Sequence, residues 1–302
     1  MSQASSQFET ETRVDVRSLP GYRWDESGQS VLSGALLDLY RRIDNMFLRW
    51  AGDCQAPEFF FPTFISAHEL GKLDYFRSFP QLVTFPAVLD ASETNLKSFA
   101  EGEPLDSQGC VHLTALDSVR NVLTPAACYH FYVLFQGQTL EEPRYVTTRA
   151  TCFRRENHYL PLERQWNFSM REIVCIGSSD EVKSFLARYR EKVDAFFRSV
   201  NLPIQWDAAT DPFFNPSRNP KFLAQRLDPV KTEMVFKTGL AIGSVNFHRN
   251  YFGEAFQISR EGQDAFSGCV AFGIERWIFA FINHFGPNPE DWPDLGRLSN
   301  GG

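Results

Sequence analysis

The chain has 302 residues, of which 43% are apolar and 22% charged, and its formal net charge is −7. That length and apolar content are enough for one large packed core, which excludes a wholly disordered chain. The acidic balance, without a lysine- or arginine-rich arm, disfavours non-specific nucleic-acid binding. No apolar run reaches the roughly 18 residues that a membrane-spanning helix needs, so no membrane association is expected.

The cysteines are scattered and form no Cys-x-x-Cys pair; they are Cys54, Cys110, Cys128, Cys152, Cys175 and Cys269. This usage is typical of reduced thiols, and the N-terminus lacks a signal-peptide pattern, so a cytoplasmic protein is expected. Residues 1–12 are polar and are predicted to be disordered. Residues 13–302 are predicted to form a single domain.

The first third of the chain predicts a helix and then mixed structure. Apolar residues recur at helical spacing from 31 to 50. After Pro57 the pattern predicts a strand at 59–65, a short helix at 67–76 and a strand near 82–85. The polar segment 90–106 is predicted to be a loop.

A second helix start is predicted at Thr124, with Pro125 at the first helical position and Cys128 in the opening turn. A helix N-terminus lowers the pKa of a thiol and favours the thiolate that binds metals. The alternative is a buried cysteine that packs as a small hydrophobic residue.

Residues 151–178 predict two strands joined by a short loop. Arg154 and Glu156 share one strand face, since alternate residues of a strand point the same way. One parity of the return strand holds Trp166, Phe168, Met170, Glu172, Val174 and Ile176. A carboxylate in such an apolar row is costly unless an arginine or a metal pairs with it. The alternative is a structural hairpin with an Arg–Glu ion pair.

An amphipathic helix follows at 179–200, with Ser179 as its expected N-cap. Its outer face carries Lys183, Arg188, Arg190, Lys192 and Arg198, which are either simply solvated or dock an acidic partner. Adjacent strands are predicted from Lys231 and from Gly239. The last strand ends at Gly273, and a helix then places Arg276 in its first turn, where backbone amides favour anions.

Four of these patterns carry a resemblance to a known family. Phe-Arg-x-Glu followed by Arg-x-x-x-Phe-x-x-x-Glu resembles motif 2 of seryl-type class II aminoacyl-tRNA synthetases, and Gly-x-x-Arg at 273–276 resembles their motif 3. The segment from residue 59 resembles the dimer-forming motif 1 region. The resemblance implies an α+β fold, an antiparallel sheet flanked by helices, and a homodimer. Residues 201–231 resemble the insertion of the carrier-protein ligases in this family, which is expected to bind the carrier.

Cys128, Glu172 and Cys269 are too far apart in sequence for spacing to define a metal site. Two thiolates and a carboxylate nevertheless suit zinc, with an open fourth position. Methanogen-type seryl-tRNA synthetases, and the amino acid:[carrier protein] ligases that resemble this chain, hold zinc with such a set. In them the amine of the amino acid takes the open position. The alternative is three unrelated structural residues.

The resemblance also implies an ATP site. Arg154 would hold the α-phosphate and the substrate carboxylate, Glu156 would accept from the adenine amino group, and Phe168 would stack on the adenine. Arg276 and Arg164 would bind the γ-phosphate end, with the adenine between Phe168 and Arg276.

Magnesium is expected with the ATP. Leu240 stands where the family carries a magnesium-binding glutamate, and Glu233 is the replacement candidate. Trp166 and Asn246 are expected to line the amino-acid pocket beside the zinc and to favour a small side chain such as glycine or alanine.

The resemblance implies that the acceptor is the phosphopantetheine thiol of a small acidic carrier protein. The expected docking positions are Arg188, Arg190, Arg218, Lys221 and Arg226. A tRNA substrate is not expected, because no long coiled-coil arm precedes the core. The alternatives are a seryl-type tRNA ligase, a non-catalytic sensor of amino acids or nucleotides, and a purely structural protein.

Overall fold

The computed structural model describes residues 13–218 and 229–296. Its centre is a seven-stranded sheet in the order β3-β7-β8-β14-β11-β10-β9, antiparallel except where β3 runs parallel to β7. These strands are β3 (Glu58–Phe59), β7 (Arg144–Phe153), β8 (Asn167–Gly177), β14 (Phe266–Gly273), β11 (Leu240–Arg249), β10 (Lys231–Phe236) and β9 (Ile204–Ala209). The predicted α+β fold with a mainly antiparallel sheet is confirmed.

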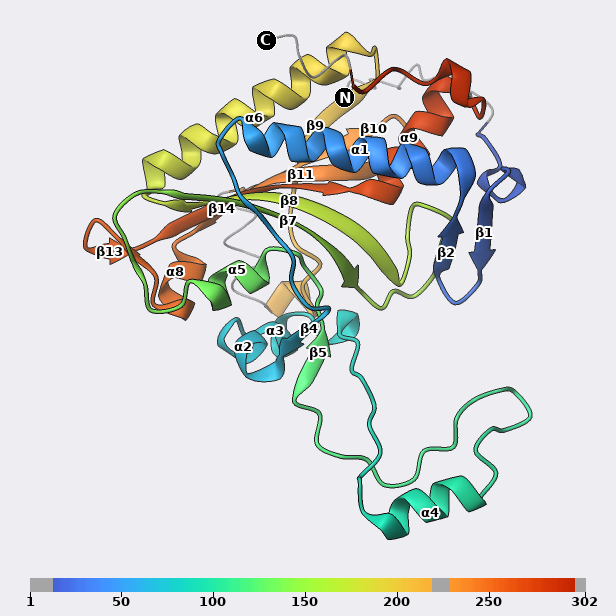
Figure 1. Cartoon of the computed structure of the whole chain (residues 1–302). Helices are drawn as coiled ribbons and strands as arrows, with labels where there is room; N and C mark the ends of the chain where they lie inside the picture. Colours follow the sequence, from blue (N-terminus) through green and yellow to red (C-terminus); the bar gives the residue numbers. More distant parts are fainter. Residues whose placement is uncertain (1–12, 219–228, 297–302) are drawn as a thin grey trace.

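Three helices cover one face of this sheet (Figure 1): α1 (Gly34–Gly52), α6 (Ser179–Ser199) and α9 (Ile274–Phe285). The strands present Ile173, Val270 and Phe272 to them, and Phe47 of α1 stacks on Phe272 with ring centroids 4.0 Å apart. The predicted helices at 179–200 and after Gly273 are confirmed. The helix predicted at 31–50 is confirmed except at its start, because Val31 and Leu32 belong to β2 (Gln29–Leu32) and α1 begins at Gly34. No described helix is long and apolar enough to cross a membrane.

The opposite face is covered more sparsely, by α5 (Tyr129–Leu134) and α8 (Tyr251–Phe256). Beside them lie β4 (Phe64–Ser66), β5 (Asn121–Leu123), α2 (Ala67–Lys72), α3 (Tyr75–Ser78) and η2 (Pro80–Leu82). Because strand residues alternate between faces, Glu172 and Cys269 point to this side while their neighbours face α1 and α6. The gap between the covering elements becomes the cavity described below.

The remaining elements are peripheral. They are η1 (Val16–Ser18), β1 (Tyr22–Asp25), β2 (Gln29–Leu32), α4 (Glu93–Glu101), β6 (Thr139–Leu140), η3 (Pro216–Arg218), β12 (Ser259–Arg260), β13 (Gln263–Asp264) and η4 (Pro289–Asp291). Figure 1 shows α4 at the end of an arm that projects away from the sheet.

Several local predictions need correction. The 90–106 segment contains α4 rather than only loop, and residues 82–85 form no strand because η2 and an extended segment replace it. The strand expected at 59–65 is divided into β3 and β4, with Pro62 between them. The helix α6 is capped by Ser178 rather than Ser179, since Ser178 and Glu181 form a reciprocal capping box.

The segment 201–231 is only partly separate from the sheet. Its residues 204–209 form β9, which pairs along β10 as an edge strand. Lys221 and Arg226 lie outside the described residues, as do residues 1–12. The division into a tail, one domain and a carrier-binding insertion therefore stays a prediction.

A buried ion-pair network joins α1 and β3 to the middle of β8. Arg171 is 1% exposed; its Nε and one terminal nitrogen donate to the two Asp44 oxygens at 2.8 and 3.1 Å, and the other donates to Glu58 at 2.7 Å. A buried guanidinium is tolerated when its donors are paired in this way. Glu172, next in sequence, points to the opposite face, so this network helps to fix the strand that carries it.

Candidate active site

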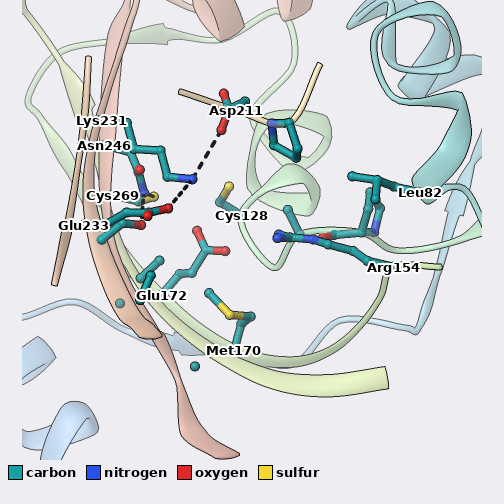
Figure 2. A pocket seen from close by; sticks show the side chains of 18 of the residues that line it. Leu82, Cys128, Arg154, Met170, Glu172, Asp211, Lys231, Glu233, Asn246 and Cys269 are labelled. Carbon is teal, nitrogen blue, oxygen red and sulfur yellow. Dashed lines mark hydrogen bonds and ion pairs between the residues drawn. The ribbon is translucent and has the colours of Figure 1, made fainter. Parts of the chain in front are cut away.

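A cavity of about 420 Å³ opens on the sparsely covered side of the sheet, over β8, β11 and β14. All but one of the sequence-predicted site residues line it: Cys128, Arg154, Glu156, Arg164, Phe168, Glu172, Glu233, Asn246, Cys269 and Arg276. Figure 2 shows the cysteines and Glu172 at one part of this cavity and Arg154 beside them. Residues spread over half the chain thus meet in one place.

The two cysteine sulfurs and a Glu172 oxygen all lie within 4.8 Å of one another, and all three residues are buried. Glu172 and Cys269 come from the neighbouring strands β8 and β14, while Cys128 precedes α5. The backbone N–H of Ala127 donates to Glu172 Oε1 at 3.1 Å, which fixes the carboxylate against the start of α5. The three residues are therefore close together in space, contrary to the alternative that they are unrelated.

Two expectations about Cys128 are wrong in detail. Thr124 does not cap the helix, because its hydroxyl donates to the Ala126 carbonyl at 2.9 Å and α5 begins only at Tyr129, with Cys128 as the N-cap residue. The pKa of Cys128 is not lowered but raised well above its usual value, by the hydrogen bond to Cys269, by burial and by the charge of Glu172. The six-residue helix α5 provides too little positive potential at its N-terminus to overcome these effects.

The pKa of Cys269 is also raised. Its hydrogen bond with Cys128 lowers this pKa, but burial and the nearby Glu172 charge outweigh that contribution. Two buried thiols whose ionisation is disfavoured, beside a carboxylate, form a site in which a divalent cation would favour the thiolates. The donor set of two sulfurs and one oxygen fits zinc in composition and number.

Three arginines line the same cavity. They are Arg154, Arg164 and Arg276, and burial together with the charges of Arg154 and Arg164 lowers the pKa of Arg276 to about 10. Arg276 is anchored by donating to the carbonyls of Glu163 at 2.7 Å and Ala241 at 2.8 Å. Guanidinium groups held against their mutual repulsion provide a binding site for a polyanion such as a triphosphate.

Two of these arginines contact the residues predicted to bind adenine, Glu156 and Phe168. Arg164 donates to Glu156 at 2.7 Å, and the Arg154 guanidinium carbon lies 5.3 Å from the centroid of the Phe168 ring. Arg154 also donates through Nε to the Pro125 carbonyl at 2.9 Å. The β7 strand ends at Phe153, so Arg154 and Glu156 lie beyond the strand and not on it as predicted.

Glu233 faces the same cavity and is paired with Lys231 at 3.1 Å. Lys231 also lies 3.4 Å from Asp211, so it bridges two carboxylates, as the dashed lines in Figure 2 show. A cation at Glu233 would have to compete with Lys231. The role of Glu233 as a magnesium ligand stays a prediction.

Trp166 is the exception among the predicted residues, because it does not line the cavity. Its indole N–H donates to the Thr84 hydroxyl at 3.0 Å, and its ring stacks near Tyr159. The prediction continued the strand parity back to Trp166, but β8 begins only at Asn167 and the alternation fails before it. Asn246 does line the cavity, and its side-chain nitrogen donates to the Cys269 sulfur at 3.2 Å.

The sequence interpretation missed other cavity residues, chiefly Glu275 and His248. Glu275 precedes Arg276, and both of its oxygens accept from the backbone N–H of Ser169, at 3.0 and 2.9 Å. The sequence did offer a signal for Glu275, because it is an acidic residue beside Arg276 at a predicted helix start. His248 lies two residues after Asn246 in the predicted strand, but its direction depends on a register shift between Phe247 and Arg249 that the sequence does not show.

Glu275 gives a pH-dependent prediction. Burial raises its pKa from 4.5 to about 7, so in this range the folded protein binds a proton that the unfolded chain has released. The free energy of unfolding should therefore fall as pH rises from 4.5 through 7, by about 3 kcal/mol from this group. Glu275→Gln keeps an acceptor for Ser169 but does not titrate, so its stability should lack this decline.

Urea unfolding of the wild type and the variant across this pH range measures the difference between the two curves. Glu254→Gln, at an exposed position of α8, is the matched control and should follow the wild type. Parallel curves for wild type and Glu275→Gln would contradict the prediction.

Comparisons with known proteins identify the family of this chain. The family model of the tRNA synthetase class II core domain (G, H, P, S and T) matches residues 116–285. Amino acid–[acyl-carrier-protein] ligase 1 of Bradyrhizobium diazoefficiens is 33% identical over 243 residues, which are 77% of this chain and 73% of that protein. A type-2 serine–tRNA ligase of Methanococcus aeolicus is 25% identical over 258 residues, 79% of this chain but 49% of that protein.

Among solved structures, the M. kandleri seryl-tRNA synthetase, in its complex with A. aeolicus tRNASec, has the same fold. Its TM-score is 0.76 at 18% identity, and the match covers 90% of this chain and 56% of that one. The chain therefore belongs to the class II aminoacyl-tRNA synthetase core family, and within it to the group of the amino acid–[acyl-carrier-protein] ligases.

Proposed function

We propose that the protein activates a small amino acid with ATP and transfers it to the phosphopantetheine thiol of a carrier protein. The observation that carries the proposal is a single cavity that is lined by both a Cys–Glu–Cys cluster and three arginines. An amine and a polyphosphate are the two groups such a cavity suits. The similarity to amino acid–[acyl-carrier-protein] ligases supports the choice of acceptor.

In the first step a carboxylate oxygen of the amino acid attacks the α-phosphorus of ATP. The bond to pyrophosphate breaks, and aminoacyl-AMP remains. Arg154 holds the α-phosphate and the carboxylate, and Arg276 with Arg164 holds the departing pyrophosphate. Their contribution is positioning and charge neutralisation, which are the main sources of rate in such transfers.

Glu156 and Phe168 recognise the adenine in this proposal. Glu156 pairs with Arg164, so nucleotide binding would require that pair to open or to share the carboxylate. Phe168 has Arg154 over one side of its ring. The adenine sandwich between Phe168 and Arg276 is retained as a proposal, since Arg276 lies in the same cavity.

Zinc would be held by Cys128, Glu172 and Cys269, with a fourth position left for the substrate. When bound, it would supply a Lewis acid that retains a neutral amine and excludes acids that lack one. Asn246 fixes the Cys269 sulfur beside this position and, with the surrounding cavity wall, favours a small side chain. Magnesium is proposed with ATP, with Glu233 near it.

In the second step the carrier thiol, as thiolate, attacks the carbonyl carbon of the adenylate, and the bond to AMP breaks to leave a thioester. Arg188 and Arg190 project from α6, on the sheet face opposite the cavity, which is unfavourable for a carrier whose arm must reach inside. Arg218 follows the cavity-lining segment Asp211–Phe213 in the chain and remains a proposed docking position.

The test is amino-acid-dependent exchange of labelled pyrophosphate into ATP, followed by transfer to phosphopantetheinylated carrier protein and to tRNA offered side by side. Exchange with a small amino acid and loading of the carrier alone is the expected result. Loading of tRNA would favour the seryl-type tRNA ligase instead. Binding of amino acid or nucleotide without any exchange would favour the sensor.

We further propose a homodimer formed through the motif 1 region. The edge strand β3 has no partner on its outer side among the described strands, and the adjacent Phe60 is 93% exposed. An unpaired edge beside an exposed aromatic ring is costly in water and suits contact with a second copy. All six cysteines are free thiols, which supports the proposed cytoplasmic location.

Phe60→Glu is expected to convert the dimer to monomer at micromolar concentration, because a buried unpaired carboxylate opposes association. Sedimentation velocity measures the change. Val31→Glu, at a 61% exposed position of β2, is the matched control and should leave the dimer intact. A Phe60→Glu variant that still sediments as a dimer would rule out this interface.

A further inference from the structure

The strand β11 is irregular beside the Cys–Glu–Cys cluster. Asn246 lies opposite Cys269 in the sheet, and the register then shifts between Phe247 and Arg249. His248 is the extra residue of this β-bulge. Arg249 adopts a φ of 54°, in the left-handed region that non-glycine residues seldom occupy. Bulges of this kind redirect side chains near functional sites, and here the redirected side chain is His248.

The redirected imidazole lies between the cluster and two hydroxyl groups. Its Nε2 is 3.6 Å from the Cys269 sulfur. Its Nδ1 is 3.1 Å from the Tyr132 hydroxyl and 3.1 Å from the Ser267 hydroxyl. From the other direction, the Asn246 amide nitrogen donates to the same sulfur at 3.2 Å.

Aromatic packing holds this arrangement in place. The Tyr132 ring is fully buried and stacks on Phe252 with centroids 3.9 Å apart. His248 meets the same Phe252 ring edge-on, at 5.0 Å. Tyr132 and His248 are thus both fixed against one side chain, so their hydrogen bond has a defined geometry.

Both hydroxyls that contact Nδ1 are able to donate, which favours the His248 tautomer with its hydrogen on Nε2. A phenol is a good donor, and when Tyr132 donates to Nδ1 the neutral imidazole carries its own hydrogen on Nε2, facing the Cys269 sulfur. Cys269 then has two N–H donors, from His248 and Asn246. Among the described residues no side-chain N–H donor contacts the Cys128 sulfur in the same way.

We propose that Tyr132 and His248 act with Asn246 as positioning residues that orient the Cys269 thiolate and weaken its donation to the metal. The pair of sulfurs would then be unequal, with Cys128 the stronger donor. This inference rests on the proposed zinc site. Outer groups that hydrogen-bond to ligands commonly set ligand orientation and metal affinity.

The experiment uses the full-length protein loaded with cobalt(II) in place of zinc, which makes the thiolate–metal bonds visible as charge-transfer absorption. His248→Phe removes an N–H donor and leaves the sulfur more electron-rich. Tyr132→Phe removes the hydroxyl at Nδ1 that favours the hydrogen on Nε2, so both variants should move this absorption to longer wavelength. Zinc affinity, measured by competition with a chromophoric chelator, should fall about 10- to 100-fold in His248→Phe, because the loss of thiolate orientation outweighs the stronger donation of the freed sulfur. His248→Gln, which keeps an N–H, should restore much of both.

Tyr132→Phe removes one oxygen and keeps the ring stacked on Phe252, so it remains informative should His248→Phe fail to fold. His284→Gln, on α9 and outside the cavity, is the control and should match the wild type in both readouts. Wild-type absorption and affinity in folded Tyr132→Phe and His248→Phe would overturn the inference while leaving the zinc site standing. Failure of the wild type to bind either metal would instead overturn the proposed site itself.

Discussion

Glu172→Gln is expected to lower pyrophosphate exchange about 1000-fold, equivalent to roughly 4 kcal/mol of lost transition-state stabilisation. The amide has nearly the shape of the carboxylate and can still accept from Ala127, so the fold should be kept. The substitution removes the carboxylate from a cluster whose two thiols have raised pKa values. Metal should be lost with activity, because neither sulfur is ionised cheaply without a cation.

Metal content by mass spectrometry and exchange rate are measured on the same samples, with and without chelator. Chelation of the wild type should reproduce the variant, and zinc should restore only the wild type. Cys175→Ala is the matched control, since Cys175 is buried in the same strand but faces α6. Full zinc content together with normal exchange in Glu172→Gln would exclude Glu172 as a ligand.

Arg154→Ala should slow adenylate formation about 100- to 1000-fold, mainly in kcat, because the guanidinium neutralises charge that grows on the α-phosphate during attack. Arg154→Lys should recover only part of this, since an ammonium cannot make the paired contacts of a guanidinium. The variant also loses the contact with Phe168, so a smaller rise in KM for ATP is expected.

Arg155→Ala is the control, because Arg155 is adjacent in sequence, exposed, and absent from the cavity wall. Single-turnover formation of aminoacyl-AMP separates the chemical step from product release. A normal single-turnover rate in Arg154→Ala would remove Arg154 from the activation step and leave Arg276 as the principal phosphate ligand.

Local sequence pattern predicted the regular helices and strands of this protein but not the irregular segments between them. The strand alternation through Phe168 and Glu172 and the helix periodicity of α6 and α9 could be read directly, since regular elements repeat their environment every two or 3.6 residues. The same regularity placed Arg276 at a helix start. Where regularity ended, prediction failed: Trp166 precedes the strand, and Thr124 lies before a turn that delays α5.

Sequence alone determined which residues have the chemistry for a metal and a polyphosphate: two cysteines, a carboxylate in an apolar row, and arginines at element ends. Only the tertiary structure decided that they share one cavity, because the pairing of β8 with β14 brings Glu172 to Cys269 and the packing of α5 on the sheet adds Cys128. The tertiary structure also determines the raised thiol pKa values and the bulge that turns His248 toward Cys269. Burial and cross-strand register depend on the whole sheet, and no local window of the chain contains them.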